Sequence, residues 1–187
     1  MIRKFRPSSR LIESVGFLEE IYKKPPAPIK TEEGVQYTSE NHLYNVIRTP
    51  LDVCEVSMLD NITFPRKNKS QLYRSVSLDY PKCSIILSGS FFYPKNGYMS
   101  WHTNKDAPGL RLYLSYTEHE NSSFFIYKDG NDIIKDPDYV GWTAREFLID
   151  KDNLLWHSVF AYKPRISTGV RIINNLLYKI LSKNDIK

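Results

Sequence analysis

The chain has 187 residues, of which 41% are hydrophobic and 13% aromatic, and its formal net charge is +5. This length and composition suit one folded domain and exclude wholesale disorder or a second full domain. Two cysteines, no signal-like opening and no apolar run near the ~20 residues needed to cross a bilayer predict a cytoplasmic protein without a disulfide framework.

Residues 1–80 are predicted to form a helical cover, with extended connecting segments, over a β core. Apolar side chains recur at helical spacing from Leu11 to Tyr22, and Pro25 ends any helix there. A second helix is expected from Ser39 to Arg48, with Ser39 as its N-cap.

Two basic stretches are the only sequence features that suggest nucleic-acid binding. The first ten residues are expected to form a loosely held basic arm, and the stretch from Pro65 to Ser70 a basic loop. Solvated surface is the preferred explanation for most of this charge, and a nucleic-acid partner rests on charge alone.

Short β-rich stretches separated by turn residues fill residues 83–173, a pattern typical of an all-β sandwich or barrel. The predicted strands are Cys83–Tyr93, Gly97–His102, Leu110–Thr117, Ser123–Tyr127, Thr143–Ile149, Leu154–Ala161 and Arg165–Ile173. Residues 170–182 then show helical spacing of apolar residues, which predicts a C-terminal helix packed outside the sheet.

Alternation along the predicted strands places polar side chains together on one face. In the strand from Leu110, alternate leucines share one side, and Arg111 and Tyr113 share the other. In the last strand Arg165 and Ser167 share a face. A sandwich or barrel with a polar interior typically holds a ligand rather than a dry core.

One set of residues has the order and spacing of a split site. His102 ends a predicted strand, Asn104 follows two positions later, and His157 comes 55 positions after His102. Arg165 follows in R-I-S-T-G, where Ser167 shares its face. A guanidinium suits bidentate contact with a carboxylate, and the serine hydroxyl can add a further hydrogen bond.

This order resembles the non-haem Fe(II), 2-oxoglutarate-dependent oxygenases, and more weakly the small virus-encoded members similar to prolyl hydroxylases. The resemblance covers about Tyr93 to Val170. It implies a mainly β fold, a double-stranded β-helix of the jelly-roll or cupin type, with the N-terminal and C-terminal helices outside. It also implies that His102 and His157 bind Fe(II) and that Arg165 and Ser167 bind the 2-oxoglutarate co-substrate.

Asn104 departs from the family pattern, which has a carboxylate two positions after the first histidine. Three interpretations remain open: Asn104 is a weaker, neutral ligand; Asp106 supplies the carboxylate after a turn; or the site has lost iron chemistry. Arg111 and Tyr113 are further candidates to contact co-substrate or substrate, although an outward-facing polar pair fits equally well.

The resemblance implies an enzyme that hydroxylates a C–H bond and releases succinate and CO2. The primary substrate stays open among a protein or peptide, a free amino acid, a nucleobase and a small metabolite. A virus-encoded member would act in the host cytoplasm. The alternative is a non-catalytic binding or structural module on the same fold.

Overall fold

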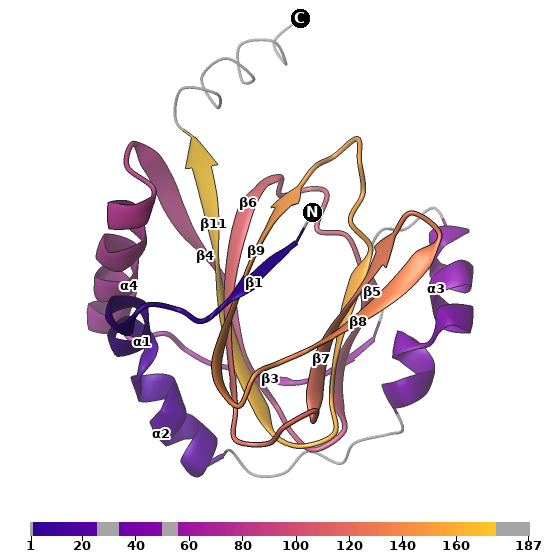
Figure 1. Ribbon diagram of the computed structural model, residues 1–187, viewed down its shortest axis with the longest axis horizontal. Coiled ribbons are helices and arrows are strands. Elements are labelled where there is room, and N and C mark those ends of the chain that lie inside the picture. Colours follow the sequence, from indigo (N-terminus) through magenta and orange to yellow (C-terminus); the bar gives the residue numbers. More distant parts are fainter. Residues whose placement is uncertain (1, 26–33, 50–55, 175–187) are drawn as a thin grey trace, which may run out of the picture.

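Two antiparallel sheets face each other and enclose the interior of the protein (Figure 1). The computed structural model describes residues 2–25, 34–49 and 56–174. The strands are β1 (Arg3–Phe5), β2 (Ser57–Met58), β3 (Asp60–Asn61), β4 (Cys83–Tyr93), β5 (Gly97–His102), β6 (Gly109–Thr117), β7 (Ser123–Asp129), β8 (Asp132–Pro137), β9 (Gly141–Ile149), β10 (His157–Ala161) and β11 (Arg165–Asn174). The major sheet has the order β1-β9-β6-β11-β4-β3 and the minor sheet the order β2-β5-β10-β7-β8. This arrangement confirms the predicted double-stranded β-helix.

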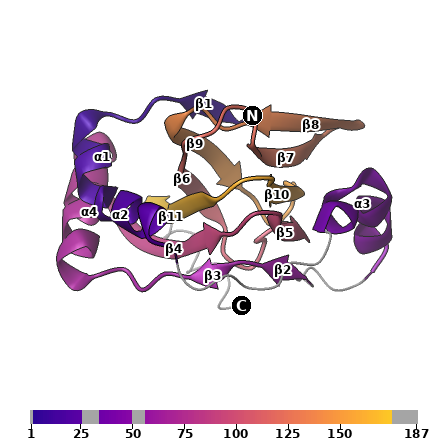
Figure 2. The same cartoon turned by 90° about the horizontal axis from the view of Figure 1, so that it is seen from below.

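The edge strands of the two sheets lie near one another at both margins of the sandwich. Seen from below, β2 and β3 lie along one margin, and β1 and β8 along the other (Figure 2). Lys4 on β1 forms an ion pair with Asp136 on β8, so a charged contact joins the sheets at that margin.

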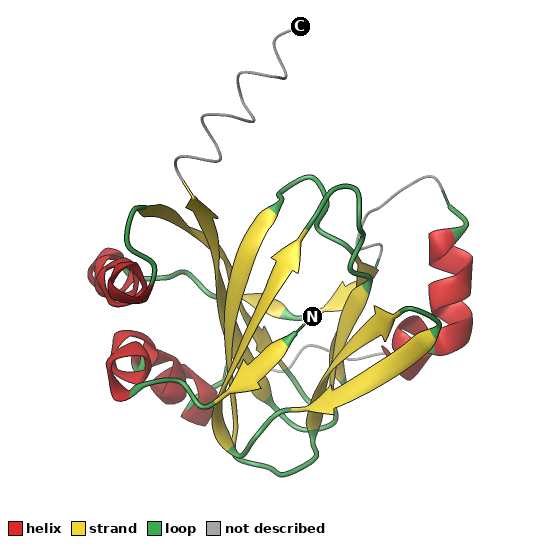
Figure 3. Ribbon diagram, turned by 45° about the horizontal axis from the view of Figure 1, so that its top comes forward, coloured by secondary structure: helices red, strands yellow, loops and turns green. Residues whose placement is uncertain are grey.

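Helices cover the outer faces of both sheets (Figure 3). The helices α1 (Ser9–Val15), α2 (Phe17–Lys23) and α4 (Arg66–Asp79) lie on the major sheet. The helix α3 (Glu40–Ile47) and the 3-10 helix η1 (Gly34–Thr38) lie on the minor sheet. Among the described residues, no helix is long and apolar enough to cross a membrane.

Apolar side chains pack in three layers. Leu112, Leu114 and Ile166 of the major sheet are buried against helices α1, α2 and α4. Tyr98 and Trp101 of the minor sheet are buried against α3. A third cluster lies between the sheets and combines aromatic with aliphatic side chains. Its buried members are Tyr93, Phe125, Phe147, Ile149, Val159 and Ala161. The leucine face predicted for β6 therefore lies under helices, and its opposite face points to the interior.

The N-terminal helices follow local sequence signals. The Ser39 hydroxyl accepts a hydrogen bond from the backbone N–H of His42 at 3.2 Å, which confirms the predicted cap of α3. The single helix predicted over residues 11–22 is instead two helices, α1 and α2, which meet at Gly16. Glycine lowers helix propensity, which explains why the change of direction occurs there.

Three segments predicted to be irregular form regular structure. The basic arm contains β1, which pairs with β9 through Lys4 and Arg145. The basic loop begins α4, whose buried Leu72 and Val76 are spaced for one helical face. The turn-rich stretch after Asp129 contains β8, which pairs with β7. In each case tertiary contact decides the structure of a segment whose own composition is mostly polar.

The prediction of a C-terminal helix over residues 170–182 is wrong for its first residues. Residues 170–174 continue strand β11, whose Ile172 pairs with Ile85 of β4 and Leu110 of β6. The apolar residues there are β-branched, which suits a strand flanked by two others. The rest of the predicted helix, residues 175–182, lies outside the described residues.

A β-bulge interrupts the pairing of β4 with β11. Gly169 lies opposite Gly89, but Val170 lies opposite Leu87, so Ser88 is the extra residue. Before the bulge Leu87 faces the helices, and after it Phe91 and Tyr93 face the interior. The bulge therefore changes which alternate residues of β4 point inward.

Candidate functional site

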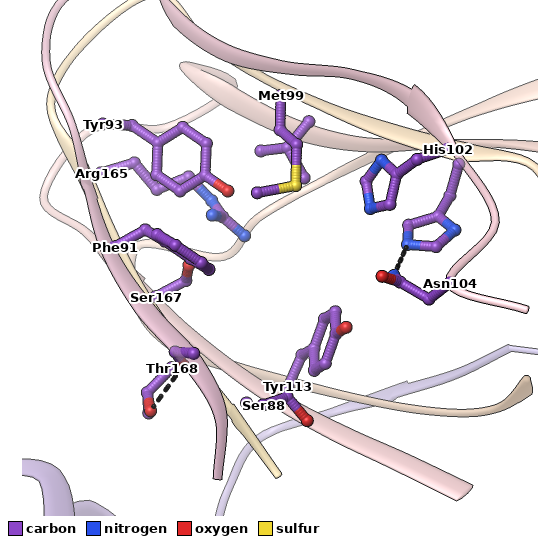
Figure 4. A pocket seen from close by; sticks show the side chains of 14 residues that line it. Ser88, Phe91, Tyr93, Met99, His102, Asn104, Tyr113, Arg165, Ser167 and Thr168 are labelled. Atoms are coloured by element: carbon purple, nitrogen blue, oxygen red, sulfur yellow. Dashed lines mark hydrogen bonds between the residues drawn. The ribbon is translucent and has the colours of Figure 1, made fainter. Parts of the chain in front are cut away.

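A cavity of about 190 Å³ lies between the two sheets. Its wall combines aromatic side chains with a few polar groups from β4, β5, β10 and β11. Figure 4 shows Arg165, Tyr93 and Phe91 gathered on one side and His102 with Asn104 on the other, with Met99 and Tyr113 between them. The cavity thus has two polar ends separated by an apolar middle.

The two histidines come together because their strands are neighbours. His102 ends β5, His157 begins β10, and the two residues lie directly opposite each other in the antiparallel register. Residues opposite each other point to the same face, and the ring centroids are 4.1 Å apart. The structure therefore brings together the pair predicted from a separation of 55 positions.

Backbone carbonyls determine the tautomer of both rings. Nδ1 of His102 donates to the carbonyl oxygen of Ser100 at 2.7 Å, and Nδ1 of His157 donates to that of Leu155 at 2.9 Å. A carbonyl oxygen only accepts, so each Nδ1 carries the hydrogen and each Nε2 presents a lone pair. These hydrogen bonds fix the orientation of both imidazoles. In metal sites, the nitrogen of a histidine ligand that does not bind the metal makes a hydrogen bond of the same kind.

Burial keeps His157 neutral. The pKa of His157 lies well below its usual value, chiefly because the ring is buried and also because it lies beside His102. A neutral imidazole with a lone pair on Nε2 is the form that binds a metal ion.

Asn104 completes this end of the cavity. Its Nδ2 donates to Nε2 of His157 at 3.3 Å. Its backbone φ is 58°, in the left-handed region that asparagine tolerates better than most residues. The chain turns there immediately after β5, and this turn directs the amide back towards His157.

Asp106, the alternative carboxylate, is placed elsewhere. Its side chain is exposed, and it is not among the residues that line the cavity. Within the described ranges, no three His, Cys, Asp or Glu side chains gather closely enough to hold a metal ion. Of the two residues predicted as oxygen ligands near His102, the structure brings only Asn104 to the histidines, with its amide nitrogen facing His157.

Arg165 lies at the other end of the cavity with Ser167. The guanidinium is 4.9 Å from the ring centroid of Tyr93, and Nε donates to Asp138 at 2.8 Å. Its Nη1 is buried and has no hydrogen-bond partner among the described residues. A buried donor without a partner is costly, and it indicates a place where an acceptor binds.

Asp138 was not predicted from the sequence, where it belongs to a turn-like D-P-D stretch. Its fully buried carboxylate accepts hydrogen bonds from Ser115, Ser123, Arg145 and Arg165. Burial alone would raise the pKa of Asp138, but the charges of Arg165 and Arg145 outweigh burial and hold it well below its usual range. The carboxylate therefore stays ionised and restrains Arg165.

Arg111 and Tyr113 share the interior face of β6, so they are not the outward-facing pair that the sequence also allowed, but only Tyr113 lines the cavity. Burial raises the pKa of Tyr113, so the phenol stays protonated. Arg111 lies beside the cavity, where it donates to the carbonyl oxygen of Ala107 and to the hydroxyl of Ser88.

Neither a protein-family model nor a curated protein sequence matches the chain. Solved structures do match it. A prolyl hydroxylase from Trichoplax adhaerens, solved with a peptide fragment of the hypoxia inducible factor oxygen degradation domain, is 12% identical with a TM-score of 0.54, over 92% of this chain and 83% of that one. A Pseudomonas putida prolyl-4-hydroxylase is 11% identical with a TM-score of 0.52, over 93% of this chain and 92% of that one.

At these identities the likeness shows the fold. The chain has the double-stranded β-helix fold found in prolyl hydroxylases, over nearly its whole length.

Proposed function

We propose that the chain is an Fe(II)- and 2-oxoglutarate-dependent oxygenase that hydroxylates its substrate and produces succinate and CO2. One observation carries the proposal: a single cavity has two oriented imidazoles at one end and a buried guanidinium N–H without a partner at the other. The first suits a divalent metal ion and the second a carboxylate.

The donor set at the histidine end fits Fe(II). Nε2 of His102 and of His157 would bind the ion, and Asn104 would supply its amide oxygen as the third protein ligand. The Asn104 amide now directs its NH2 group at His157, so it must turn over for the oxygen to face a cation between the residues. The amide oxygen carries no net charge, so it holds a divalent ion less tightly than a carboxylate would.

The opposite end fits the distal carboxylate of 2-oxoglutarate. Nη1 of Arg165 would donate to that carboxylate, and the hydroxyl of Ser167 would donate from the same strand face. Asp138 holds Nε of the same guanidinium and so directs its other nitrogens into the cavity. Hydrogen bonds to ionised groups in a buried setting are the stronger ones, so this end contributes most to co-substrate affinity.

Bound Fe(II) would supply the reduction of O2, with one oxygen atom entering succinate as 2-oxoglutarate loses CO2 and the other entering the hydroxylated product. The chain itself binds, orients and excludes water. Met99 and the protonated Tyr113 line the middle of the cavity, and Phe91 and Tyr93 add apolar surface beside Arg165. These side chains separate the two polar ends and keep the co-substrate extended between them.

The primary substrate of this activity would be a protein or peptide, a nucleobase or a small metabolite in the cytoplasm. A peptide is supported by the Trichoplax prolyl hydroxylase, which was solved with a peptide fragment.

A second candidate function is a non-catalytic binding module on the same fold. It is favoured by Asn104, because no carboxylate joins the two histidines within the described residues. On this reading the Arg165 end still binds a dicarboxylate, but the histidine end does not retain iron.

Anaerobic titration with Fe(II) and 2-oxoglutarate separates the two candidates. The oxygenase predicts a visible charge-transfer absorption that requires both additions, and succinate formation once O2 is admitted. His157→Ala should abolish the absorption, whereas the matched control His119→Ala, at an exposed turn, should keep it. Binding of 2-oxoglutarate without any iron-dependent absorption would support the binding module instead.

A further inference from the structure

Two arginines lie directly opposite each other on neighbouring strands of the major sheet. Arg111 on β6 pairs in register with Arg171 on β11, so both side chains leave the same face of the sheet. Like charges in this position destabilise a sheet unless something compensates them. The pair therefore requires an explanation.

The shared face is the interior one. Arg111 alternates with Tyr113, which lines the cavity. The stem of Arg171 lies over Gly109, where an added Cβ would be 3.2 Å from its Cγ. Gly109 belongs to the same face of β6, so Arg171 also lies on the inner side, beyond the end of the cavity.

Neither arginine has an acidic partner among the described residues. Arg111 is only 3% exposed, its Nε has no hydrogen-bond partner, and its contacts are the carbonyl oxygen of Ala107 and, at 3.5 Å, the hydroxyl of Ser88. Burial lowers the pKa of Arg111, and the charge of Arg171 lowers it further. A nearly buried cation compensated only by neutral groups, beside a second cation, is costly, and a bound anion would offset that cost.

This pair lies next to the metal end of the proposed active site. Ser88, which Arg111 contacts, lines the cavity and is exposed, so it marks the cavity's opening. Ala107, the other contact, belongs to the turn that carries Asn104. Arg165 lies at the other end of the cavity and is compensated by Asp138, so the two positive centres are separate.

We propose that Arg111 and Arg171 bind an anionic group, a carboxylate or a phosphate, of the primary substrate at the cavity opening. This inference rests on the proposed function and narrows its substrate to an acidic molecule. The guanidinium fork of Arg111 would give the buried contact, and Arg171, at the outer position, would add a second one. The anion would be held beside the Asn104 turn, so a neighbouring C–H bond of the same molecule would be directed towards the histidines.

The test measures binding of inorganic phosphate and of acetate to the full chain by calorimetry and by thermal shift, with acetamide as the uncharged counterpart of acetate. Arg171→Gln is the decisive variant because this residue is only half-buried, and Arg111→Gln is its partner. Arg74→Gln, on the exposed side of α4, is the matched control for loss of one positive charge.

We expect each of the two variants to weaken the binding of phosphate or acetate by ~10-fold or more, as for the loss of a hydrogen bond to a charged group. Arg74→Gln should change this affinity less than about twofold, as expected for a distant, screened charge. Without an anion, Arg171→Gln should unfold at the same temperature as the wild type or higher, since it removes a repulsion. A purely structural arginine would give a lower temperature.

The comparison of phosphate with acetate decides which anion the site prefers. Equal binding of acetate and acetamide, or anion affinity unchanged by Arg171→Gln, would overturn the proposal. Arg165→Gln separates this proposal from the proposed function: it should abolish 2-oxoglutarate binding and keep the phosphate and acetate binding that Arg171→Gln weakens. Loss of the anion affinity in Arg165→Gln alone would place the anion at the Arg165 end and also overturn the proposal.

Discussion

Replacing Asp138 by asparagine tests the buried charge network behind the cavity. The substitution keeps the shape of the side chain but removes the negative charge that lies between Arg145 and Arg165. Arg145 keeps a second carboxylate, because its Nε donates to Asp136 at 2.6 Å. Arg165 keeps none within the described residues, and its side chain is only 4% exposed.

The expected loss of stability follows from this difference between Arg145 and Arg165. Removing one partner of a buried ion pair typically lowers the free energy of unfolding by about 3–5 kcal/mol, because the remaining charge is left uncompensated. The hydroxyls of Ser115 and Ser123 also lose a charged acceptor, so we expect a value in the upper half of that range. Asp136→Asn should cost less, about 1–2 kcal/mol, since Asp136 is partly exposed and pairs with Lys4 at the surface.

Urea unfolding at pH 7, followed by tryptophan fluorescence, measures both variants. With a denaturant slope of about 2 kcal/mol/M, Asp138→Asn should lower the midpoint by about 2 M. The pKa of Asp138 is depressed in the folded protein, so its contribution is present above the unfolded pKa of about 3.9 and is lost as the pH falls towards the folded pKa. The difference between wild type and variant should therefore shrink below about pH 4.

A loss of under about 1 kcal/mol at pH 7 would refute this reasoning, because it would mean that water or another anion compensates Arg165. An effect equal to that of Asp136→Asn would refute it too.

Three further predictions concern the metal end, the cavity wall and a helix cap. Asn104→Asp should raise the affinity of the chain for a divalent metal by ~10-fold or more, because it adds a negative charge beside the ion. Competition with a chelator measures this affinity, and an unchanged value would exclude Asn104 as a ligand. Gly169→Ala places a Cβ 2.5 Å from the Tyr113 ring, so it should lower the free energy of unfolding by about 1–3 kcal/mol and weaken 2-oxoglutarate binding; wild-type behaviour in both assays would contradict the cavity geometry. Ser39→Ala removes the acceptor for the His42 N–H and should cost about 1 kcal/mol in urea unfolding, and no loss would show that water replaces the cap.

Local patterns were sufficient for most of the sandwich. Cys83–Tyr93 and Gly97–His102 were predicted with the observed bounds, because turn residues delimit both strands. Alternation placed Arg111 and Tyr113 on the face of β6 opposite the leucines, but it did not show whether that face points inward. His102 and His157 could be paired only through the resemblance, since nothing local shows that β5 and β10 are neighbours.

Contacts between distant segments explain which features could not be predicted from the sequence. β1 is three residues long and pairs with residues about 140 positions away, so its sequence R-K-F indicates only a charged arm. Asp138 depends on donors from four strands, and a D-P-D turn gives no sign of them. His42, for which no partner was predicted, lies 3.0 Å from the hydroxyl of Ser100 on β5.

The bulge at Ser88 makes the site depend on chain length as well as on residue type. N-terminal to the bulge, Ile85 and Leu87 of β4 point towards the helices. C-terminal to the bulge, Phe91 and Tyr93 of the same strand line the cavity. If β4 paired without the bulge, with Ser88 opposite Val170, simple alternation would turn those two aliphatic side chains inward. The one extra residue therefore keeps aliphatic side chains under the helices and aromatic side chains in the cavity, and substitutions at Ser88 that preserve the bulge leave both in place.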